Sequence, residues 1–277
     1  MNRLYVVATP IGNLEDVSLR ALRVLREVSL VAAEDTRTAG VFLRHHGLNP
    51  KLISYTDHNK RGRIPQILER LAEGDVALVT DAGTPAISDP GVDLVAAARA
   101  AGHEVLAVPG PSAPIAAMSV AGLGGAAFRF AGFLPRTTGD LRRLLEDAAA
   151  RRETLVAFES PSRLRRSLAV IAGILPERRI AVCRELTKLH EETFLGTASE
   201  ALAHFTQPRG EIVLVIEGAP AGTLAPEQDE AGLREEIAEM RRLGLTRSQA
   251  TTLLSRHYST PRRRLYELWL EVPHLGA

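Results

Sequence analysis

The sequence predicts an α/β protein with two α/β domains followed by a small helical region. Three observations predict this architecture. Short apolar runs alternate with helical patterns over the first 110 residues, a second block of the same kind spans residues 116–218, and the segment after residue 227 is helical without strands. With 277 residues, 45% of them hydrophobic and 24% charged, the chain has the composition of a globular protein and not of a disordered one.

The first block is expected to form an N-terminal domain over residues 1–115. Its helices are indicated by apolar residues at helical spacing, such as the i, i+3, i+4, i+7 series that starts at Ile64 and is followed by Gly74 as a stop signal. Regular alternation of apolar strands with helices is typical of a parallel sheet covered by helices. The expected strands are residues 4–8, 29–33, 51–54, 76–80 and 104–108.

The second block is expected to form another α/β domain over residues 116–218. Two consecutive strands around Ala181 and Phe194 have no helix between them, which predicts a mixed sheet instead of a purely parallel one. The expected strands are residues 128–132, 154–158, 179–183, 193–196 and 211–217, and the expected helices are residues 141–149, 163–174 and 199–205.

A Gly- and Pro-rich linker at residues 218–222 is expected to lead into a helical, basic C-terminal region over residues 227–277. Between Arg241 and Arg264 this region has seven arginines and no acidic residue. Two short helices around a turn, edged with arginine, resemble a helix-turn-helix unit that binds nucleic-acid phosphates, with an ordinary solvated surface as the alternative. The candidate RNA-binding residues are Arg247, Arg262, Arg263 and Arg264.

Charge and cysteine content exclude several classes of protein. The single cysteine, Cys183, has no partner in the chain, so a disulfide scaffold is excluded and a reducing cytoplasm is expected. The net charge of +1 provides no overall attraction to nucleic acid, so any such binding must come from local clusters. No secretory signal is expected at the start of the chain. The uncharged run over residues 105–128 has three prolines and is expected to form a strand, a loop and a short helix, not a membrane span.

Three Gly- and Pro-rich loops, residues 9–13, 81–91 and 109–113, follow expected parallel strands. Ligands of open α/β sheets bind at the carboxyl ends of the strands, so these loops predict a ligand site at one sheet edge. Neither a dinucleotide fingerprint nor a phosphate-binding P-loop is present, and no metal-ligand spacing occurs, so no metal is expected. Asp81 either offers its carboxylate to a hydroxylated or cationic ligand or caps its own loop.

These loops belong to motifs that run along nearly the whole chain. They are ATPIGNL (8–14), EDTR (34–37), DAGTPAISDPG (81–91), VPGPSA (108–113), ESPSR (159–163), RELTK (184–188) and RGEIV (209–213). In their order and in their amino-acid residues, these motifs resemble the bacterial small-subunit ribosomal RNA methyltransferase I family of the tetrapyrrole methylase superfamily. The chain departs from the family pattern at Thr56-Asp57, where a His-Glu pair is usual, and at Ser162, where histidine is usual.

The resemblance implies two α/β domains with S-adenosylmethionine in the cleft between them, and a homodimer. It implies a cytoplasmic enzyme, without membrane contact, that methylates the ribose 2′-hydroxyl of a cytidine in 16S ribosomal RNA within the small ribosomal subunit. The cofactor-binding residues that it implies are Pro10, Gly12, Asp81, Gly83, Thr84, Ile87, Ser112, Ala113, Phe158, Leu186 and Gly210.

A weakly acidic ribose hydroxyl reacts faster when a base or a positive neighbour assists it. The charged motifs expected at the cleft supply Glu34, Asp35, Arg37, Glu159, Arg184, Glu185, Lys188 and Glu192. Of these, Asp35, Arg37, Glu159 and Lys188 are the catalytic candidates, and salt bridges across the domain interface are the alternative role for each of them. The identity of the general base stays open.

Two other functions compete with RNA ribose methylation. A small-molecule C-methyltransferase acting on a tetrapyrrole would share the fold, but the basic C-terminal region and the motif at residues 34–37 speak against it. A non-catalytic nucleic-acid-binding regulator built around the C-terminal region would leave the three ligand loops unexplained.

Overall fold

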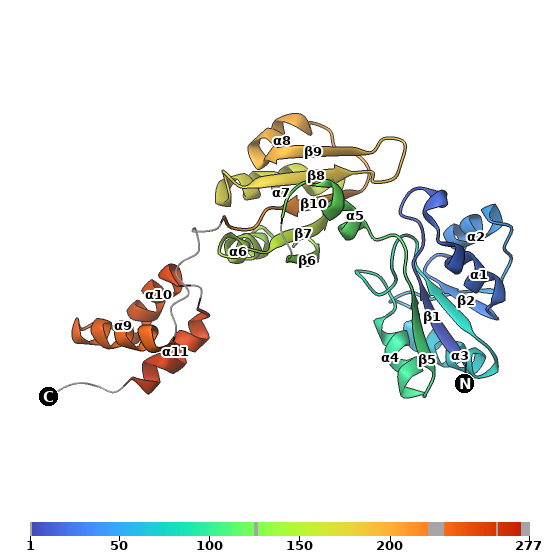
Figure 1. Cartoon of the computed structure of the whole chain (residues 1–277), viewed down its shortest axis with the longest axis horizontal. Helices are drawn as coiled ribbons and strands as arrows, with labels where there is room; N and C mark the ends of the chain where they lie inside the picture. Colours follow the sequence, from blue (N-terminus) through green and yellow to red (C-terminus); the bar gives the residue numbers. More distant parts are fainter. Residues whose placement is uncertain (1, 125–126, 221–229, 259, 273–277) are drawn as a thin grey trace.

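The computed structural model describes residues 2–124, 127–220, 230–258 and 260–272. In this structure the chain forms three units that follow one another along the longest axis of the molecule (Figure 1). The first two are α/β units with one five-stranded sheet each, as the sequence predicted, and the third is a group of helices. Residues 221 and 222 of the expected linker lie outside the described residues.

The N-terminal unit is a parallel sheet of order β3-β2-β4-β1-β5 with helices on both faces. Leu25 and Phe42 bring α1 and α2 against one face, and Ile67 and Leu94 bring α3 and α4 against the other. Its elements are β1 (Arg3–Val7), α1 (Leu19–Glu27), β2 (Leu30–Ala33), α2 (Thr36–His45), β3 (Leu52–Ser54), α3 (Lys60–Glu73), β4 (Val76–Val79), α4 (Val92–Ala100) and β5 (Glu104–Val108), with a short 3₁₀ helix η1 (Leu14–Asp16).

The second unit has a mixed sheet of order β6-β7-β10-β8-β9, in which only β6 and β7 run parallel to each other. Helix α5 starts in the third Gly- and Pro-rich loop and packs Ala117 against Val156 and Val215, on the face opposite to α6, α7 and α8. The elements are α5 (Ala113–Val120), β6 (Phe128–Phe133), α6 (Thr138–Ala149), β7 (Thr154–Glu159), α7 (Pro161–Ile174), β8 (Arg179–Arg184), β9 (Glu192–Thr197), α8 (Ala198–His204) and β10 (Ile212–Ile216).

The expected helices and strands of both sheets are present, and their ends differ by only a few residues. Helix α6 starts before the expected residue 141 because the Thr137 side chain caps it by accepting a hydrogen bond from the Asp140 amide. Helix α7 starts earlier because Pro161 stands in its first turn, where a missing N–H costs nothing.

The C-terminal unit consists of α9 (Glu230–Arg242), α10 (Arg247–His257) and α11 (Arg262–Glu271) around a small core that includes Leu254, Leu265 and Trp269. Arg241 contributes to this core: its guanidinium lies 4.4 Å from the centre of the Trp269 ring and donates to the Val272 carbonyl. In the part of the chain that the structure describes, no helix is long and apolar enough to span a membrane.

Candidate functional site

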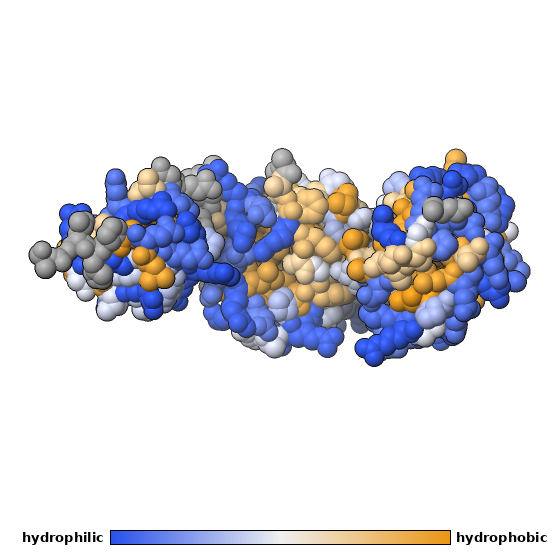
Figure 2. Space-filling model, turned by 90° about the horizontal axis from the view of Figure 1, so that it is seen from below, coloured by the Kyte–Doolittle hydropathy of each residue, from blue (hydrophilic) through white to orange (hydrophobic). Residues whose placement is uncertain are grey.

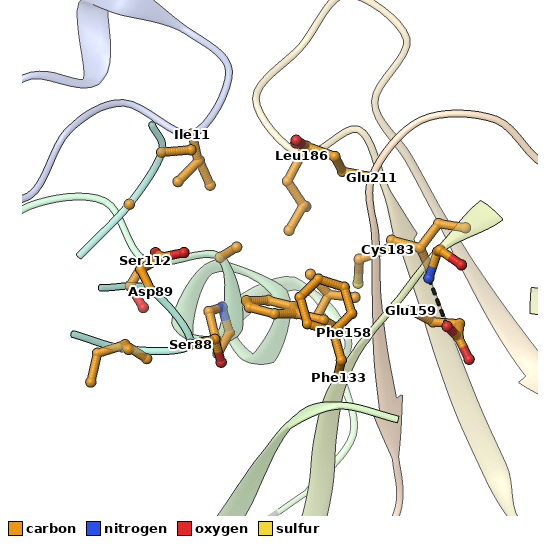
Figure 3. Close-up of a pocket in the computed structure, with 18 of the residues that line it drawn as sticks. Ile11, Ser88, Asp89, Ser112, Phe133, Phe158, Glu159, Cys183, Leu186 and Glu211 are labelled. Atoms are coloured by element: carbon orange, nitrogen blue, oxygen red, sulfur yellow. Dashed lines mark hydrogen bonds between the residues drawn. The ribbon is translucent and has the colours of Figure 1, made fainter. Parts of the chain in front are cut away.

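A cavity of about 360 Å³ lies where the first two units meet. Its size is in the range of small-molecule sites. Figure 3 shows Ile11, Asp89 and Ser112 on one side and Leu186, Cys183 and Glu211 on the other, with the rings of Phe133 and Phe158 between them. The lining is largely apolar and comes from the loops after β1, β4 and β5 and from the inner face of the second sheet.

Most of the residues implied for cofactor binding line this cavity, while three stand outside its wall. The lining residues among them are Gly83, Thr84, Ile87, Ser112, Ala113, Phe158, Leu186 and Gly210. Pro10 and Gly12 flank Ile11, which does reach the cavity, and Asp81 lies next to the lining residue Ala82. These three therefore lie beside the wall of the cavity without forming part of it.

The three Gly- and Pro-rich loops are tied together by hydrogen bonds. Thr9 and Gly83 exchange backbone hydrogen bonds, with N···O distances of 2.9 and 3.1 Å. Thr84 donates its hydroxyl to the Pro111 carbonyl at 3.2 Å. The carboxyl ends of β1, β4 and β5 thus form one connected wall at the sheet edge where the three loops were expected to lie.

Gly12 is the point where this wall contacts the second unit. A Cβ at this position would lie 2.5 Å from Lys188 Cγ and 2.9 Å from the Leu186 carbonyl oxygen. Real Cβ atoms do not approach other atoms this closely, so only glycine fits between the two loops. The contact closes the cavity beside Ile11 and Leu186, which both line it.

Backbone strain is concentrated around the cavity. Among the described residues other than glycine, those with positive φ are Ala86 and Ser88 in the loop after β4, and Glu185 and Thr187 in the loop after β8. Such conformations cost free energy and persist where the surrounding structure enforces them, commonly at ligand sites. The two loops that carry the strain are those that border the cavity from opposite units.

A group of carboxylates lies at the same edge of the first sheet. Burial raises the pKa of Asp89 to about 6, and the nearby Glu34 and Asp81 add to the shift. Burial likewise raises the pKa of Glu34 and that of Asp81. Asp89 lines the cavity but was not among the residues predicted from its motif; its place in the same loop as Asp81 was the available signal.

Asp81 bonds to a neighbouring segment, which differs from the capping of its own loop that was the alternative for it. Its carboxylate accepts a hydrogen bond from the Asp35 amide at 3.1 Å, so it joins the loop after β4 to the start of α2. Asp35 caps α2 and pairs with Arg37 at 2.6 Å, and the hydrogen bond from the Arg37 side chain lowers the pKa of Asp35 to about 2. Neither Asp35 nor Arg37 lines the cavity.

Glu159 borders the cavity, but its carboxylate is fully engaged in the fold. It is 2% exposed, pairs with Arg163 at 2.5 Å, and accepts hydrogen bonds from the Ser160 amide and the Ser167 hydroxyl. Figure 3 shows the hydrogen bond to Ser160 as a dashed line. This arrangement fixes the start of α7 and argues against a catalytic role for Glu159.

Lys188 is held as a cation. Burial lowers its pKa, but hydrogen bonds to Glu211 at 2.8 Å and Glu185 at 2.9 Å outweigh that effect, so the pKa is raised overall. A lysine that stays protonated serves poorly as a general base. Its position against Gly12 and Glu211 suits it to holding the cavity wall.

The candidate RNA-binding arginines differ in how strongly the fold engages them. Arg264 pairs with Glu230, Glu267 and Glu271, so its charge is compensated, contrary to the uncompensated stretch that the sequence indicated. Arg247 stacks over Tyr266 at 4.9 Å, and Arg262 donates to the Thr252 hydroxyl. Arg263 is 93% exposed on its side chain and has one loose pair with Glu267 at 3.4 Å.

Within the described ranges, no three His, Cys, Asp or Glu side chains are grouped so that they could hold a metal ion. The polar groups that face the cavity are instead single carboxylates, hydroxyls and backbone atoms, which suit an organic ligand.

Comparison with known proteins places the chain in context. A family model described as Tetrapyrrole (Corrin/Porphyrin) Methylases matches residues 3–202. The protein named Ribosomal RNA small subunit methyltransferase I in Synechocystis sp. is 45% identical over 276 residues, covering 98% of this chain and 99% of that protein. The protein of the same name in Thermotoga maritima is 48% identical over 221 residues, covering 79% of this chain and 99% of its own length.

A solved structure shares the fold at lower sequence identity. It is the uroporphyrin-III C-methyltransferase from Thermus thermophilus complexed with S-adenosyl homocysteine, which is 19% identical to this chain with a TM-score of 0.55. The match covers 78% of this chain and 97% of the solved one. It supports the two-sheet architecture described above.

Proposed function

The chain belongs to the tetrapyrrole (corrin/porphyrin) methylases and, among them, to the ribosomal RNA small subunit methyltransferase I proteins, and on this basis we propose the reaction that it catalyses. The proposed reaction is methyl transfer from S-adenosylmethionine to the ribose 2′-hydroxyl of a cytidine in 16S ribosomal RNA. The observation that carries the proposal is the 45% identity to a methyltransferase of that name along almost the entire length of both chains.

The cavity fits S-adenosylmethionine in size and chemistry. The cofactor combines a flat adenine ring and a polar ribose with a positively charged sulfonium and the charged amino and carboxylate groups of methionine. The wall offers apolar side chains, including Ile11, Phe158 and Leu186, and the carboxylate of Asp89, for which the described part of the chain shows no ion pair. The solved uroporphyrin-III methyltransferase of the same fold holds S-adenosyl homocysteine. We infer that Gly83, Thr84, Ile87, Ser112, Ala113, Phe158, Leu186 and Gly210 contact the cofactor.

The protein's contribution to catalysis is chiefly positioning. When bound, the cofactor supplies a methyl group that an oxygen can attack in line with the carbon–sulfur bond. Alignment of the reacting atoms accounts for much of the acceleration of such a displacement. The connected loops after β1, β4 and β5 hold one side of the cavity, and the Gly12 contact with Leu186 and Lys188 fixes the other side against it.

The tetrapyrrole C-methyltransferase alternative is disfavoured by the names of two similar relatives, since those at 45% and 48% identity are both named as ribosomal RNA enzymes. The solved tetrapyrrole enzyme leaves about a fifth of this chain unmatched, and the family model ends at residue 202, before the C-terminal unit. We propose that this unit assists RNA binding.

A direct assay tests the proposed function. The purified protein is incubated with S-adenosylmethionine carrying a labelled methyl group and with 16S RNA or small ribosomal subunits from cells that lack the protein. We expect label at the 2′-oxygen of one cytidine, detected as resistance of the adjacent phosphodiester bond to alkali. The proposal fails if neither substrate is labelled, if the label is on a base, or if uroporphyrinogen III is methylated instead. Comparing naked RNA with assembled subunits identifies the true substrate.

We also propose that the enzyme acts as a homodimer in the cytoplasm, where its RNA substrate is found. Apolar surface that a second copy can cover is present on α5, where Ile115 and Val120 are each at least half exposed. Figure 2 shows apolar surface on the middle unit beside the N-terminal unit. Sedimentation equilibrium should give twice the mass of the 30.0 kDa chain, and a single-chain mass would contradict the dimer.

A further inference from the structure

Strand β6 contains an irregularity next to the cavity. In its pairing with β7, Phe128 lies opposite Thr154 and Phe130 lies opposite Val156, but the next aligned pair is Phe133 with Phe158. Three residues of β6 therefore advance against two of β7. This is a β-bulge, a feature that commonly redirects a side chain beside an active site.

The bulge changes the face of the sheet to which Phe133 belongs. Side chains alternate along a strand, so in a regular pairing Gly132 would share the face of Phe130 and Phe158, while Phe133 would join Ala131 on the opposite face. Ala131 does pack with the core under α6, α7 and α8. The extra residue places Phe133 beside Phe158 on the cavity side, where the two rings meet edge to face at 5.4 Å.

Gly132 makes this bulge possible. Its φ of +66° lies in the left-handed region that glycine adopts readily. A Cβ there would lie 3.3 Å from the Ser88 hydroxyl oxygen, so β6 approaches the N-terminal unit closely at this point. Ser88 is itself one of the strained cavity residues. The bulge that redirects Phe133 therefore lies close to the N-terminal unit.

Although it lines the cavity, Phe133 is 60% exposed. Phe158, which it touches, is only partly exposed and packs with Phe130 on its other side. Phe133 therefore presents exposed apolar surface at the mouth of the cavity. A ligand that covers this surface removes it from water, which makes binding more favourable. The interior of the cavity already has buried apolar contacts in Ile11 and Leu186 for a ligand held deeper inside.

We propose that Phe133 is a positioning residue that stacks against the base of the acceptor nucleotide while the ribose of that nucleotide enters the cavity. The inference rests on the proposed RNA ribose methylation and specifies how the substrate is held. Aromatic side chains are the usual platforms for unpaired bases, because every base presents a flat π-face. A ribose carries its base on the adjacent carbon, so a platform at the cavity mouth is where a base would lie when the 2′-hydroxyl points inward.

The test compares Phe133→Ala, Phe133→Leu and Phe133→Trp with the wild-type enzyme, using small ribosomal subunits from cells that lack the protein. Loss of one stacked base costs roughly 1–3 kcal/mol, so kcat/KM for the RNA substrate should fall roughly 5- to 150-fold in the Ala variant. Leu keeps apolar surface without a ring and should be similarly impaired, whereas Trp should retain most of the activity. The defect should appear mainly in KM for the subunit.

The matched control is Phe128→Ala on the same strand. Phe128 is also an exposed aromatic residue, at 39%, but it does not line the cavity. This variant should leave kcat/KM within about twofold of wild type. The affinity of every variant for S-adenosylmethionine, measured by calorimetry, should also be unchanged, which shows that the variants are folded.

Three results would overturn the stacking role. The first is an unchanged kcat/KM in Phe133→Ala. The second is a loss of S-adenosylmethionine affinity as large as the loss of kcat/KM, which would place the cofactor against the ring. The third is a change of oligomeric state in sedimentation, which would make Phe133 a contact between copies. Failure of the proposed function is distinguishable, because the wild-type enzyme would then methylate no RNA at all.

Discussion

Gly12 in the N-terminal unit and Lys188 in the second unit are in direct contact, with no room for even one methyl group between them. The same lysine holds Glu211 and Glu185 through its ammonium group. One residue without a side chain and one with a long, cationic side chain therefore join the two walls of the cavity. The stem of Lys188 packs against the N-terminal unit while its charge organises the second unit.

Replacing Gly12 with alanine should force these loops apart. Overpacking of this kind typically costs about 1–3 kcal/mol, which predicts a loss of S-adenosylmethionine affinity of roughly 5- to 150-fold by calorimetry. Gly139→Ala in α6 is the matched control, since nothing lies within 4 Å of a Cβ there. It should leave affinity unchanged. Equal affinity of Gly12→Ala and wild type would show that the loops move apart freely.

The raised pKa of Asp89, about 6 against an ordinary value of 3.8, predicts a pH dependence of stability. The folded state holds the Asp89 proton more tightly than the unfolded state, so this group lowers the free energy of unfolding as the pH rises from about 4 to about 6. Asp89→Asn should therefore be more stable than wild type at pH 7, by an amount on the order of 1 kcal/mol, and about equal to it at pH 4. Urea titrations at the two pH values measure this, and a constant difference would contradict the shift.

Glu159→Gln should lower the free energy of unfolding of the second unit by roughly 3 kcal/mol, because it leaves the Arg163 guanidinium without its buried charge partner. Glu104→Gln, which breaks the exposed pair with Arg3, serves as the control and should cost less than about 1 kcal/mol. If Glu159 acts structurally, kcat of the folded Gln variant should remain close to that of wild type. A loss of kcat at full stability would restore it as a catalytic residue.

The arginines of the C-terminal unit should differ in how much each contributes to the salt dependence of RNA binding. Each lost phosphate contact reduces the slope of log affinity against log salt concentration by roughly 0.7 for single strands and 0.9 for duplexes. Arg263→Ala should show about one such step, since the Arg263 side chain is 93% exposed and only loosely paired with Glu267. Arg264→Ala should leave the slope nearly unchanged and instead reduce the stability of the helices, which circular dichroism detects. The reverse pattern would assign the phosphate contact to Arg264.

Sequence periodicity was enough to predict both sheets, since buried strands and amphipathic helices differ in their repeat. The ligand edge followed from loops placed after parallel strands. The bulge in β6 could not be predicted from periodicity. One extra residue does not alter the apolar character of the run, but it moves Phe133 to the other face of the sheet. The sequence therefore gave no indication of Phe133 as a residue of the site.

The charged residues were harder to assign because their roles depend on partners far apart in the chain. Glu159 stood in a motif beside Arg163, but only the fold shows that Ser167 and the Ser160 amide complete its hydrogen bonds. The charge of Arg264 was expected to be uncompensated, because Arg264 is the last residue of a stretch without acidic residues. Its partner Glu267 comes one helical turn later, and Glu230 comes from another helix.

The walls of the cavity belong to two units that have different hydrophobic cores. A ligand in the cavity therefore contacts both units and stabilises their association. The binding free energy stabilises both units, because unfolding of either unit destroys the site and releases the ligand. When the methyl donor is scarce, only direct contacts such as that of Gly12 with Lys188 hold the units together, and we expect protease-sensitive openings between them to become more frequent. We therefore expect the concentration of the donor to affect the resistance of the protein to proteolysis as well as the rate of the reaction.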